Sequence, residues 1–343
     1  MQGELRRARE LGEQCLSLAQ RDQHPEALVA AHNGLGEVLL HLGEFVAARA
    51  HLEEGIQVCE SQTSCGPARS FAAELRVYGL CWLAAPLWLL GYPDQAQKKI
   101  QEALTLAEEF GPVVSTVALA TVAFLDALYK KDVTAARKRS EAAVVRATEQ
   151  RIVQWLGLAM VVRGWAVTQQ GQSDEGIAQM RQGLARYSAT GAQLSRPYQL
   201  ALLAEAYRNE GQPEAGLVAL AEALEVVDKT GAYFSAAELY RLKGELSLPS
   251  DSRGRGPKGR QRAVLRSTAE AEACFQHAVA LARRQSAKLF ELRAVMSLAR
   301  LWQQQGKKKQ ARQMLAEIYN WFTEGFDTID LRDARALLGQ LSR

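Results

Sequence analysis

One frame repeats along this chain, and it constrains the fold more than any other feature. A small or medium residue recurs every 40 positions, and Gly36 lies 48 positions before the first of them. About seven residues after each such position a turn follows, and then a second helical stretch with a small–large–small pattern. The frame positions are Ala84, Phe124, Gly164, Ala204 and Gly244. A fixed period of this size predicts stacked helical hairpins, that is, an α-solenoid.

The first full unit fits the spacing of a tetratricopeptide repeat (TPR). If Gly36 is position 8, the turn falls at Gly43, and the second helix carries Ala48 and Gly55 around Leu52. Small residues at these positions let neighbouring helices approach closely. HEAT-type repeats share the period of 40 residues, but the small–large–small spacing favours the TPR-like interpretation.

The frame also predicts the domain organisation. The 343 residues are 48% hydrophobic, and strand-like alternation is almost absent. We therefore expect an all-α, right-handed α-solenoid of about seven TPR-like hairpins. The expected segments are a truncated repeat with only its second helix (1–22), repeats (23–248), a basic flexible insert (249–266), further repeats (267–326) and a capping helix (327–343).

The insert carries most of the excess positive charge. Residues 249–266 hold six basic side chains and one acidic one, so the rest of the +4 chain is close to neutral. Without interleaved aromatic residues the insert is typical of a solvated, disordered loop. Binding of nucleic acid or another anion by this loop is the alternative left open. Gly254, Gly256 and Gly259 spell GxGxxG, but the motif lies between helices rather than after a strand, so we expect no dinucleotide site.

Cysteine and histidine usage predicts neither disulfides nor a metal site. The five cysteines are scattered without a CxxC pair, which is typical of reduced cytosolic thiols. The five histidines form no HExxH motif and join no cysteine at ligand spacing, so we expect no metal, catalytic thiol or cofactor. The start MQGELRRARE lacks the apolar core of a signal peptide, and the longest apolar run, residues 79–91, is too short to cross a bilayer. These features indicate a cytoplasmic protein.

Several long strings carry a resemblance to a known family. They are HLGEFVAARAHLE from His41, WLLGYPDQA from Trp88, RGWAVTQQGQSDEGIAQMRQGL from Arg163, RPYQLALLAEAY from Arg196, ELYRLKGEL from Glu238, ARLWQQQGK from Ala299 and NWFTEGFDTIDLRDA from Asn320. Together they resemble the C-terminal TPR region of large bacterial signalling proteins, in which a class III adenylate/guanylate cyclase domain and a P-loop ATPase module precede the repeats. The resemblance covers nearly the whole chain and implies a regulatory arm that senses a ligand or protein.

The chain itself carries no sign of that family's chemistry. It has neither a cyclase domain nor a GxxxxGK[ST] phosphate loop, so we expect no enzymatic activity from this chain. The alternative is that it forms part of a nucleotide-processing enzyme whose catalytic domains lie outside it.

The candidate binding surface is the concave face. In TPR arrays, positions 2, 5, 9 and 12 of each unit point into that face, and here they mix aromatic and charged side chains, the types that anchor interfaces. The candidates are Asn33, Glu37, Tyr78, Trp88, Trp165, Tyr198, Glu205, Arg208, Glu238, Arg241, Glu245, Arg293 and Arg300. The alternative is that these charges only solvate the groove and pair along their own helices. Because the surface should be long and open, we expect a peptide or a helix of the parent protein as partner, with no nucleic acid and no membrane.

Overall fold

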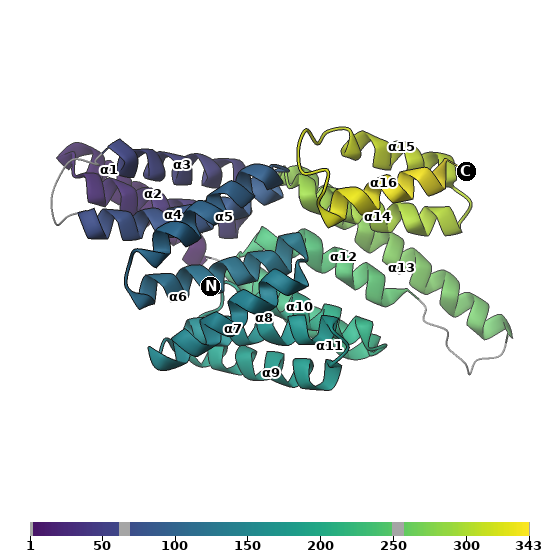
Figure 1. Ribbon diagram of the computed structural model, residues 1–343. Helices are drawn as coiled ribbons and strands as arrows, with labels where there is room; N and C mark the ends of the chain where they lie inside the picture. Colours follow the sequence, from purple (N-terminus) through teal and green to yellow (C-terminus); the bar gives the residue numbers. More distant parts are fainter. Residues whose placement is uncertain (1–2, 62–68, 249–256, 343) are drawn as a thin grey trace.

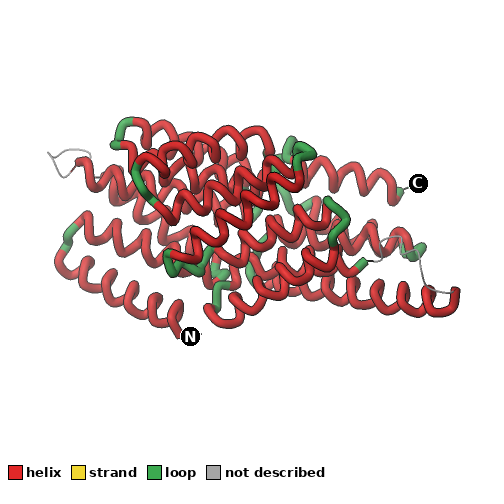
Figure 2. The backbone as a smooth tube through the Cα atoms, turned by 90° about the horizontal axis from the view of Figure 1, so that it is seen from below, coloured by secondary structure: helices red, strands yellow, loops and turns green. Residues whose placement is uncertain are grey.

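The computed structural model describes residues 3–61, 69–248 and 257–342. Within these ranges the chain is helical, with no strand (Figures 1 and 2). Seven hairpins follow one another: α2 (Pro25–Leu42) with α3 (Phe45–Ser61), α4 (Arg69–Leu89) with α5 (Pro93–Glu108), α6 (Pro112–Leu125) with α7 (Val133–Glu149), α8 (Val153–Gln169) with α9 (Ser173–Ala189), α10 (Arg196–Asn209) with α11 (Pro213–Thr230), α12 (Ala236–Ser247) with α13 (Pro257–Arg284), and α14 (Lys288–Gln304) with α15 (Lys308–Tyr319). The helix α1 (Gly3–Asp22) precedes them and α16 (Ile329–Leu341) follows. The predicted all-α, TPR-like solenoid is confirmed.

The segment expected to be a flexible insert differs in part from the prediction. Residues 249–256 lie outside the described residues, so that part of the prediction stays a prediction. From Pro257 the backbone is helical and continues into α13, so residues 257–266 extend a helix. Proline at the first helical position lacks only an N–H that would be unpaired there, and its fixed φ suits a helix start.

Close packing between the helices of a hairpin depends on the small residues of the frame. In the fourth hairpin a Cβ on Gly164 would lie 2.5 Å from the Gly176 carbonyl oxygen. A Cβ on Gly183 would lie 2.6 Å from the Gly157 carbonyl oxygen. These helices therefore pack backbone against backbone, which only glycine permits.

The turns between paired helices follow the frame as well. Seven residues after the frame position, glycines such as Gly43 (φ 83°) and Gly91 (φ 93°) adopt the left-handed conformation that ends the first helix. Among the turns that the structure describes, that of the third hairpin differs, because Lys131 (φ 53°) takes this place after a π-helical turn, η1 (Asp126–Lys130). A non-glycine residue in this conformation is strained, and π-turns of this kind recur at functional sites.

First and second helices form two layers with different environments. The first helix α10 is buried on all sides from Pro197 to Tyr207, whereas its partner α11 buries one stripe only. Another first-helix stretch, Pro112–Lys130, is apolar and long enough to cross a membrane, and 72% of its most apolar window is buried within the protein. A helix that is apolar all round is typical of such an interior layer.

The superhelix closes on itself, so the early hairpins meet the late ones (Figure 1). The His41 ring of α2 contacts Phe234 in the 3₁₀ turn η2 (Tyr233–Ser235), with ring centroids 5.2 Å apart. The Glu324 carboxylate, after α15, accepts hydrogen bonds from the backbone N–H groups of Asp94 (2.9 Å) and Gln95 (3.1 Å) at the start of α5. The expectation of a long, open concave groove is therefore wrong: tight helix packing curls the array until its interior is largely enclosed.

Candidate functional site

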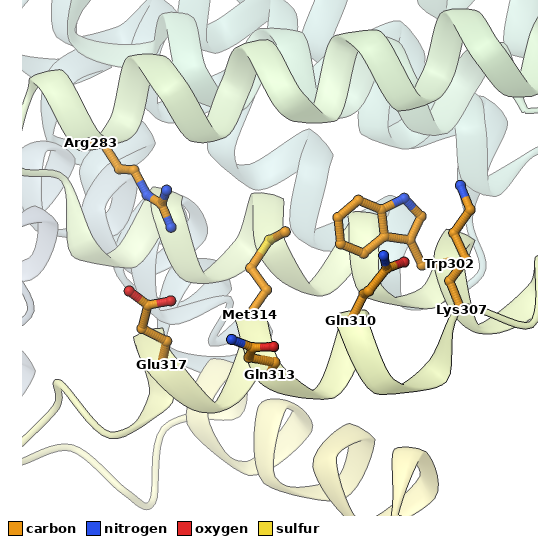
Figure 3. Close-up of a pocket in the computed structure, with 7 residues that line it drawn as sticks. All are labelled: Arg283, Trp302, Lys307, Gln310, Gln313, Met314 and Glu317. Carbon is orange, nitrogen blue, oxygen red and sulfur yellow. The ribbon is translucent and has the colours of Figure 1, made fainter.

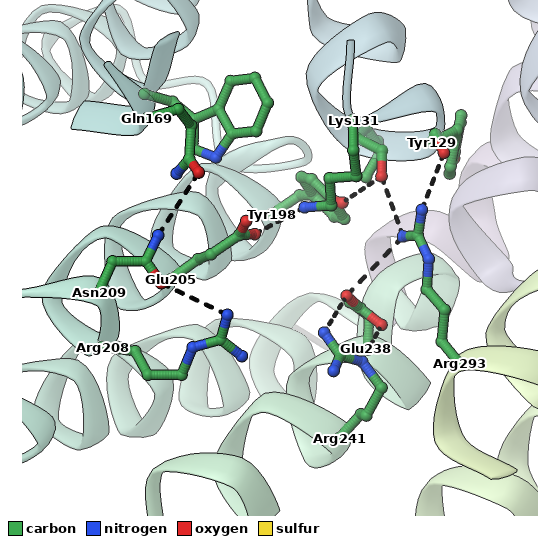
Figure 4. Close-up of polar contacts among 12 residues, drawn as sticks. Tyr129, Lys131, Gln169, Tyr198, Glu205, Arg208, Asn209, Glu238, Arg241 and Arg293 are labelled. Carbon is green, nitrogen blue, oxygen red and sulfur yellow. Dashed lines mark hydrogen bonds and ion pairs between the residues drawn. The ribbon is translucent and has the colours of Figure 1, made fainter. Parts of the chain in front are cut away.

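The interior of the superhelix contains a connected network of charged side chains rather than a purely apolar core (Figure 4). At its centre Arg241 donates two hydrogen bonds to the Glu238 carboxylate, at 2.7 and 2.8 Å. Arg241 also pairs with Glu245, one turn further along α12. Glu245 in turn accepts hydrogen bonds from Ser297 of α14 (2.9 Å) and from Arg208 of α10. The network thus joins the first helices of three successive hairpins.

Arg293 of α14 extends the network toward the third hairpin and the C-terminal helix. Its guanidinium forms a two-pronged contact with Asp330 of α16, with both distances 2.8 Å. The same group donates to the carbonyl oxygens of Leu128 (3.0 Å) and Tyr129 (2.8 Å) in η1. A π-turn leaves carbonyl groups free of regular helical partners, and a planar fork of donors is well suited to bind them.

Lys131 places a fourth cation in the interior. Its ammonium group lies 2.6 Å from the Glu205 carboxylate and 5.5 Å from the centre of the Trp165 ring. The backbone at Lys131 is left-handed, and its side chain points toward Glu205, as Figure 4 shows.

The electrostatics of the network keep the carboxylates of Glu238 and Glu205 ionised. Burial alone would raise the pKa of Glu238, but Arg241 and Arg293 outweigh it and lower that pKa to about 2. For Glu205 burial is likewise outweighed, by Lys131, and its pKa is lowered. The exposed fraction of the side chains rises from 1% at Glu238 through 17% at Glu245 to 36% at Arg208. The network is therefore sealed at one end and reaches solvent at the other.

Several buried polar atoms in the inner layer lack a protein partner. Both amide atoms of Gln199, the indole nitrogen of Trp165 and the hydroxyl of Ser235 have no hydrogen-bond partner among the described residues. An unpaired buried polar atom costs about 1–3 kcal/mol, so native proteins usually satisfy it with water or a ligand. The unsatisfied atoms belong to α8, α10 and η2, and among these residues Trp165 contacts Lys131 of the network.

The structure brings together only some of the candidates named from the sequence. Tyr198, Glu205, Arg208, Glu238, Arg241, Glu245 and Arg293 all lie in or against the network, and Trp165 contacts it through Lys131.

The remaining candidates lie outside the network. Asn33 donates to the Leu75 carbonyl oxygen at 2.8 Å, and Tyr78 pairs with Glu37, so these residues join α2 to α4. Trp88 is buried, and Arg300 is exposed. The pairing of Arg241 with Glu238 and Glu245 along α12 matches the alternative given above, in which the charges pair along their own helix.

Sequence reasoning missed three residues of the site: Lys131, Asp330 and Ser297. Lys131 occupies a turn position that holds glycine in most other units, and this departure was a readable signal. Asp330 was assigned to a capping helix, and its partner Arg293 lies 37 residues earlier. No local spacing predicts that contact.

A pocket of about 460 Å³ on the outer side of the seventh hairpin is a second candidate (Figure 3). Its lining residues are Arg283, Trp302, Lys307, Gln310, Gln313, Met314 and Glu317. Trp302 already donates to Glu272 (2.8 Å), and the Lys307 ammonium lies 5.9 Å from the Trp302 ring centre. Two of the polar groups that line this pocket are therefore already engaged within the protein.

Comparisons with known proteins identify the fold. No protein-family model and no curated protein matches the chain. A Rap protein complexed with Competence and Sporulation Factor superimposes with a TM-score of 0.58 at 15% identity, over 91% of this chain and 80% of that one. The apo form of RapI reaches a TM-score of 0.49 at 12% identity, over 91% and 99% of the two chains. A signal-transduction ATPase with a tetratricopeptide-repeat sensor from Pyrococcus horikoshii reaches 0.47 at 13% identity, over 98% of this chain and 49% of that one. At 15% identity, the likeness to the Rap protein establishes the helical repeat fold alone.

Proposed function

We propose that this chain is a TPR-type interaction and sensor module that binds a peptide or helix at the solvent end of its interior network. The observation that carries the proposal is the ion network itself. It joins three first helices, and the exposure of its side chains increases from buried Glu238 to partly exposed Arg208. Desolvating charges is costly, and an apolar interior would stabilise the fold as well or better. The network is therefore better explained by recognition of a binding partner than by a contribution to stability.

The charge at the solvent end favours a partner that carries carboxylates. Arg208 and Arg300 are the most exposed cations among the candidates, and Glu245 is already paired with Arg241. A peptide carboxylate could therefore displace Glu245 from Arg208 and form charge-assisted hydrogen bonds. The Rap protein of similar fold holds a bound factor in its complex, which supports a binding role for this architecture.

The resemblance of the sequence strings supports a more specific setting. We infer a cytoplasmic regulatory arm of a bacterial cyclase–ATPase signalling protein, whose partner is a protein or another domain of the parent. Reading the coding sequence upstream of Met1 tests this setting, because a cyclase and an ATPase domain should precede it. Purified chain should not turn over ATP or GTP, and measurable hydrolysis would contradict the binding role.

The decisive experiment is a selection of peptides on the immobilised full chain, followed by affinity measurements with two sets of variants. Arg208→Gln and Arg300→Gln should each weaken the selected peptides about tenfold or more, as loss of a charged partner does. Lys307→Gln, in the outer pocket, is the matched control and should leave affinity unchanged. Equal affinity for all three variants, with unchanged melting curves, would move the site away from the interior.

A further inference from the structure

Two histidines and a glutamate come together in the first hairpin, away from the charged network. The Nδ1 atoms of His32 and His51 lie 3.1 Å apart, and the Glu54 carboxylate lies 3.4 Å from His32 Nδ1. One ligand atom from each of the three side chains falls within 4.8 Å of the other two. The ring centroids are 5.3 Å apart with a 40° tilt, so the rings converge by their edges rather than stack.

The TPR frame brings these side chains together. His51 and Glu54 are one turn apart on α3 and share a face of that helix. Gly55 follows them, and a Cβ at that position would lie 3.2 Å from the His32 Cβ. The absence of a side chain at Gly55 lets α3 approach α2 until the His32 ring reaches its two partners.

The spacing of the donor atoms fits one bound ion. Zinc binds imidazole nitrogen and carboxylate oxygen at about 2.0–2.2 Å, so two ligands at a tetrahedral angle stand about 3.3–3.6 Å apart. The observed separations of 3.1 and 3.4 Å are close to that range. His32 is buried, whereas the Glu54 side chain is 60% exposed, so an ion has a route from solvent and room for a water ligand.

The chemistry of the donors selects the class of ion. Imidazole suits Zn²⁺, Cu²⁺ and Ni²⁺, whereas Ca²⁺ and Mg²⁺ prefer all-oxygen sites. A hydrogen bond between the two rings, with the Glu54 carboxylate as a second partner of His32, is the simpler alternative, and a metal titration distinguishes it from an ion site.

We propose that His32, His51 and Glu54 form a three-ligand site for a divalent first-row transition ion, which cross-links α2 to α3. Two of the ligands lie on one helix and the third on its partner, so the ion would fix the geometry of the first hairpin. The sequence search for ligand motifs missed the site because 19 residues separate His32 from His51.

A calorimetric titration of metal-stripped full chain with Zn²⁺ tests the site. We expect one ion per chain, with binding weakened about tenfold or more in His51→Ala and in Glu54→Gln. The matched controls are Glu53→Gln, next to Glu54 but paired with Arg49, and His277→Ala, an exposed histidine in α13. Both controls should bind Zn²⁺ as the unaltered chain does; unchanged affinity in His51→Ala and Glu54→Gln would overturn the site.

Cobalt substitution separates this site from adventitious binding to cysteine. Co²⁺ held by two imidazoles and a carboxylate should give visible absorption that is lost in His51→Ala, without a thiolate charge-transfer band. Such a band, persisting in His51→Ala, would assign the ion to a cysteine and refute the proposal. The ion should also raise the melting temperature of the unaltered chain and leave that of Glu54→Gln unchanged, because ligands stabilise only the state they bind.

Discussion

Arg293 is a fully charged side chain that is only 5% exposed, and it binds partners from hairpins far apart in sequence. Its guanidinium serves Asp330 in α16 and two carbonyl groups in η1 at once. Five fixed donors make this possible, and a lysine could not reproduce the geometry. Removing the side chain would take the Arg293 donors away from the largely buried Asp330 carboxylate and from the Tyr129 carbonyl oxygen, and would leave the Leu128 carbonyl oxygen with only the Tyr198 hydroxyl, at 3.3 Å.

We therefore expect Arg293→Met to lower the free energy of unfolding by about 3–5 kcal/mol, since a buried pair has lost one partner. Urea denaturation monitored by circular dichroism measures this change. Lys229→Ala is the control, because its pair with Glu225 lies on the exposed face of α11 and contributes little to stability. Similar losses for the two variants would mean that the interior network adds nothing beyond a surface pair.

The glycines of the fourth hairpin give a second test at this scale. A Cβ at Gly183 would meet backbone atoms of α8 at 2.6 and 2.8 Å, so Gly183→Ala must push α9 away from α8. We expect a loss of about 1–3 kcal/mol in thermal or urea unfolding. Gly339→Ala, within α16 and open to solvent, should instead stabilise the protein by up to about 1 kcal/mol. A neutral result for Gly183→Ala would show that the two helices can separate at little cost.

Among the helices, α5 is unusual because another part of the chain supplies its N-terminal cap. Its own N-cap residue, Tyr92, makes no side-chain capping bond within the described structure. The Glu324 carboxylate, more than 200 residues later, accepts from two N–H groups of the first turn instead. Asp94 returns a bond by accepting from the Gly325 N–H at 3.2 Å. This reciprocal contact is a capping interaction across the closure of the superhelix.

Replacing Glu324 with alanine should cost about 1–2 kcal/mol, the size of a lost N-cap with its charge at the helix N-terminus. Hydrogen exchange should show the loss locally, as faster exchange of the Asp94 and Gln95 amides. Asp327→Ala, an exposed change in the same loop, is the matched control. Unaltered exchange at the start of α5 would contradict the capping role.

The elements themselves were predictable, whereas their closure was not. The frame at Gly36, Ala84 and Gly164 predicted the hairpins and their turns, because small residues and left-handed glycines act through local geometry. The curvature of the array depends on small angles that accumulate over seven hairpins, and no spacing encodes that sum. The positions facing inward were therefore predictable, but their burial and their pairing with Asp330 and Lys131 were not.

At the scale of the whole molecule, His41 lies at a contact between early and late hairpins and makes the stability of the fold depend on pH. Its ring packs between Trp82 and Phe234, and burial lowers its pKa to about 4 from an ordinary 6.5. The unfolded chain therefore binds a proton more readily than the folded one between these values. Stability contributed by this residue is present above pH 6.5 and is lost as pH falls toward 4.

We expect the free energy of unfolding to fall by roughly 3 kcal/mol between pH 7 and pH 4 on account of His41. Urea unfolding of chelator-treated protein at several pH values measures the slope. His41→Phe should flatten it. His32, whose pKa is also lowered by burial, adds to the slope that remains, whereas Glu37 and Asp126, whose pKa values burial raises, oppose it. Glu238 acts in a separate window, because its pKa of about 2 removes its contribution only below about pH 4.5. An unchanged slope in His41→Phe would place the proton elsewhere.

The contact between Glu324 and the start of α5 has a mechanical consequence. An open array under tension can yield one hairpin at a time, because each unit touches only its neighbours. Here the second hairpin is tied to the loop after the seventh, so the hairpins between them form a loop shielded from tension applied farther out along the chain. Tension would have to break that tie before any intervening hairpin could peel away. The segment from α5 to α15 should thus resist extension up to one threshold force and then lengthen abruptly.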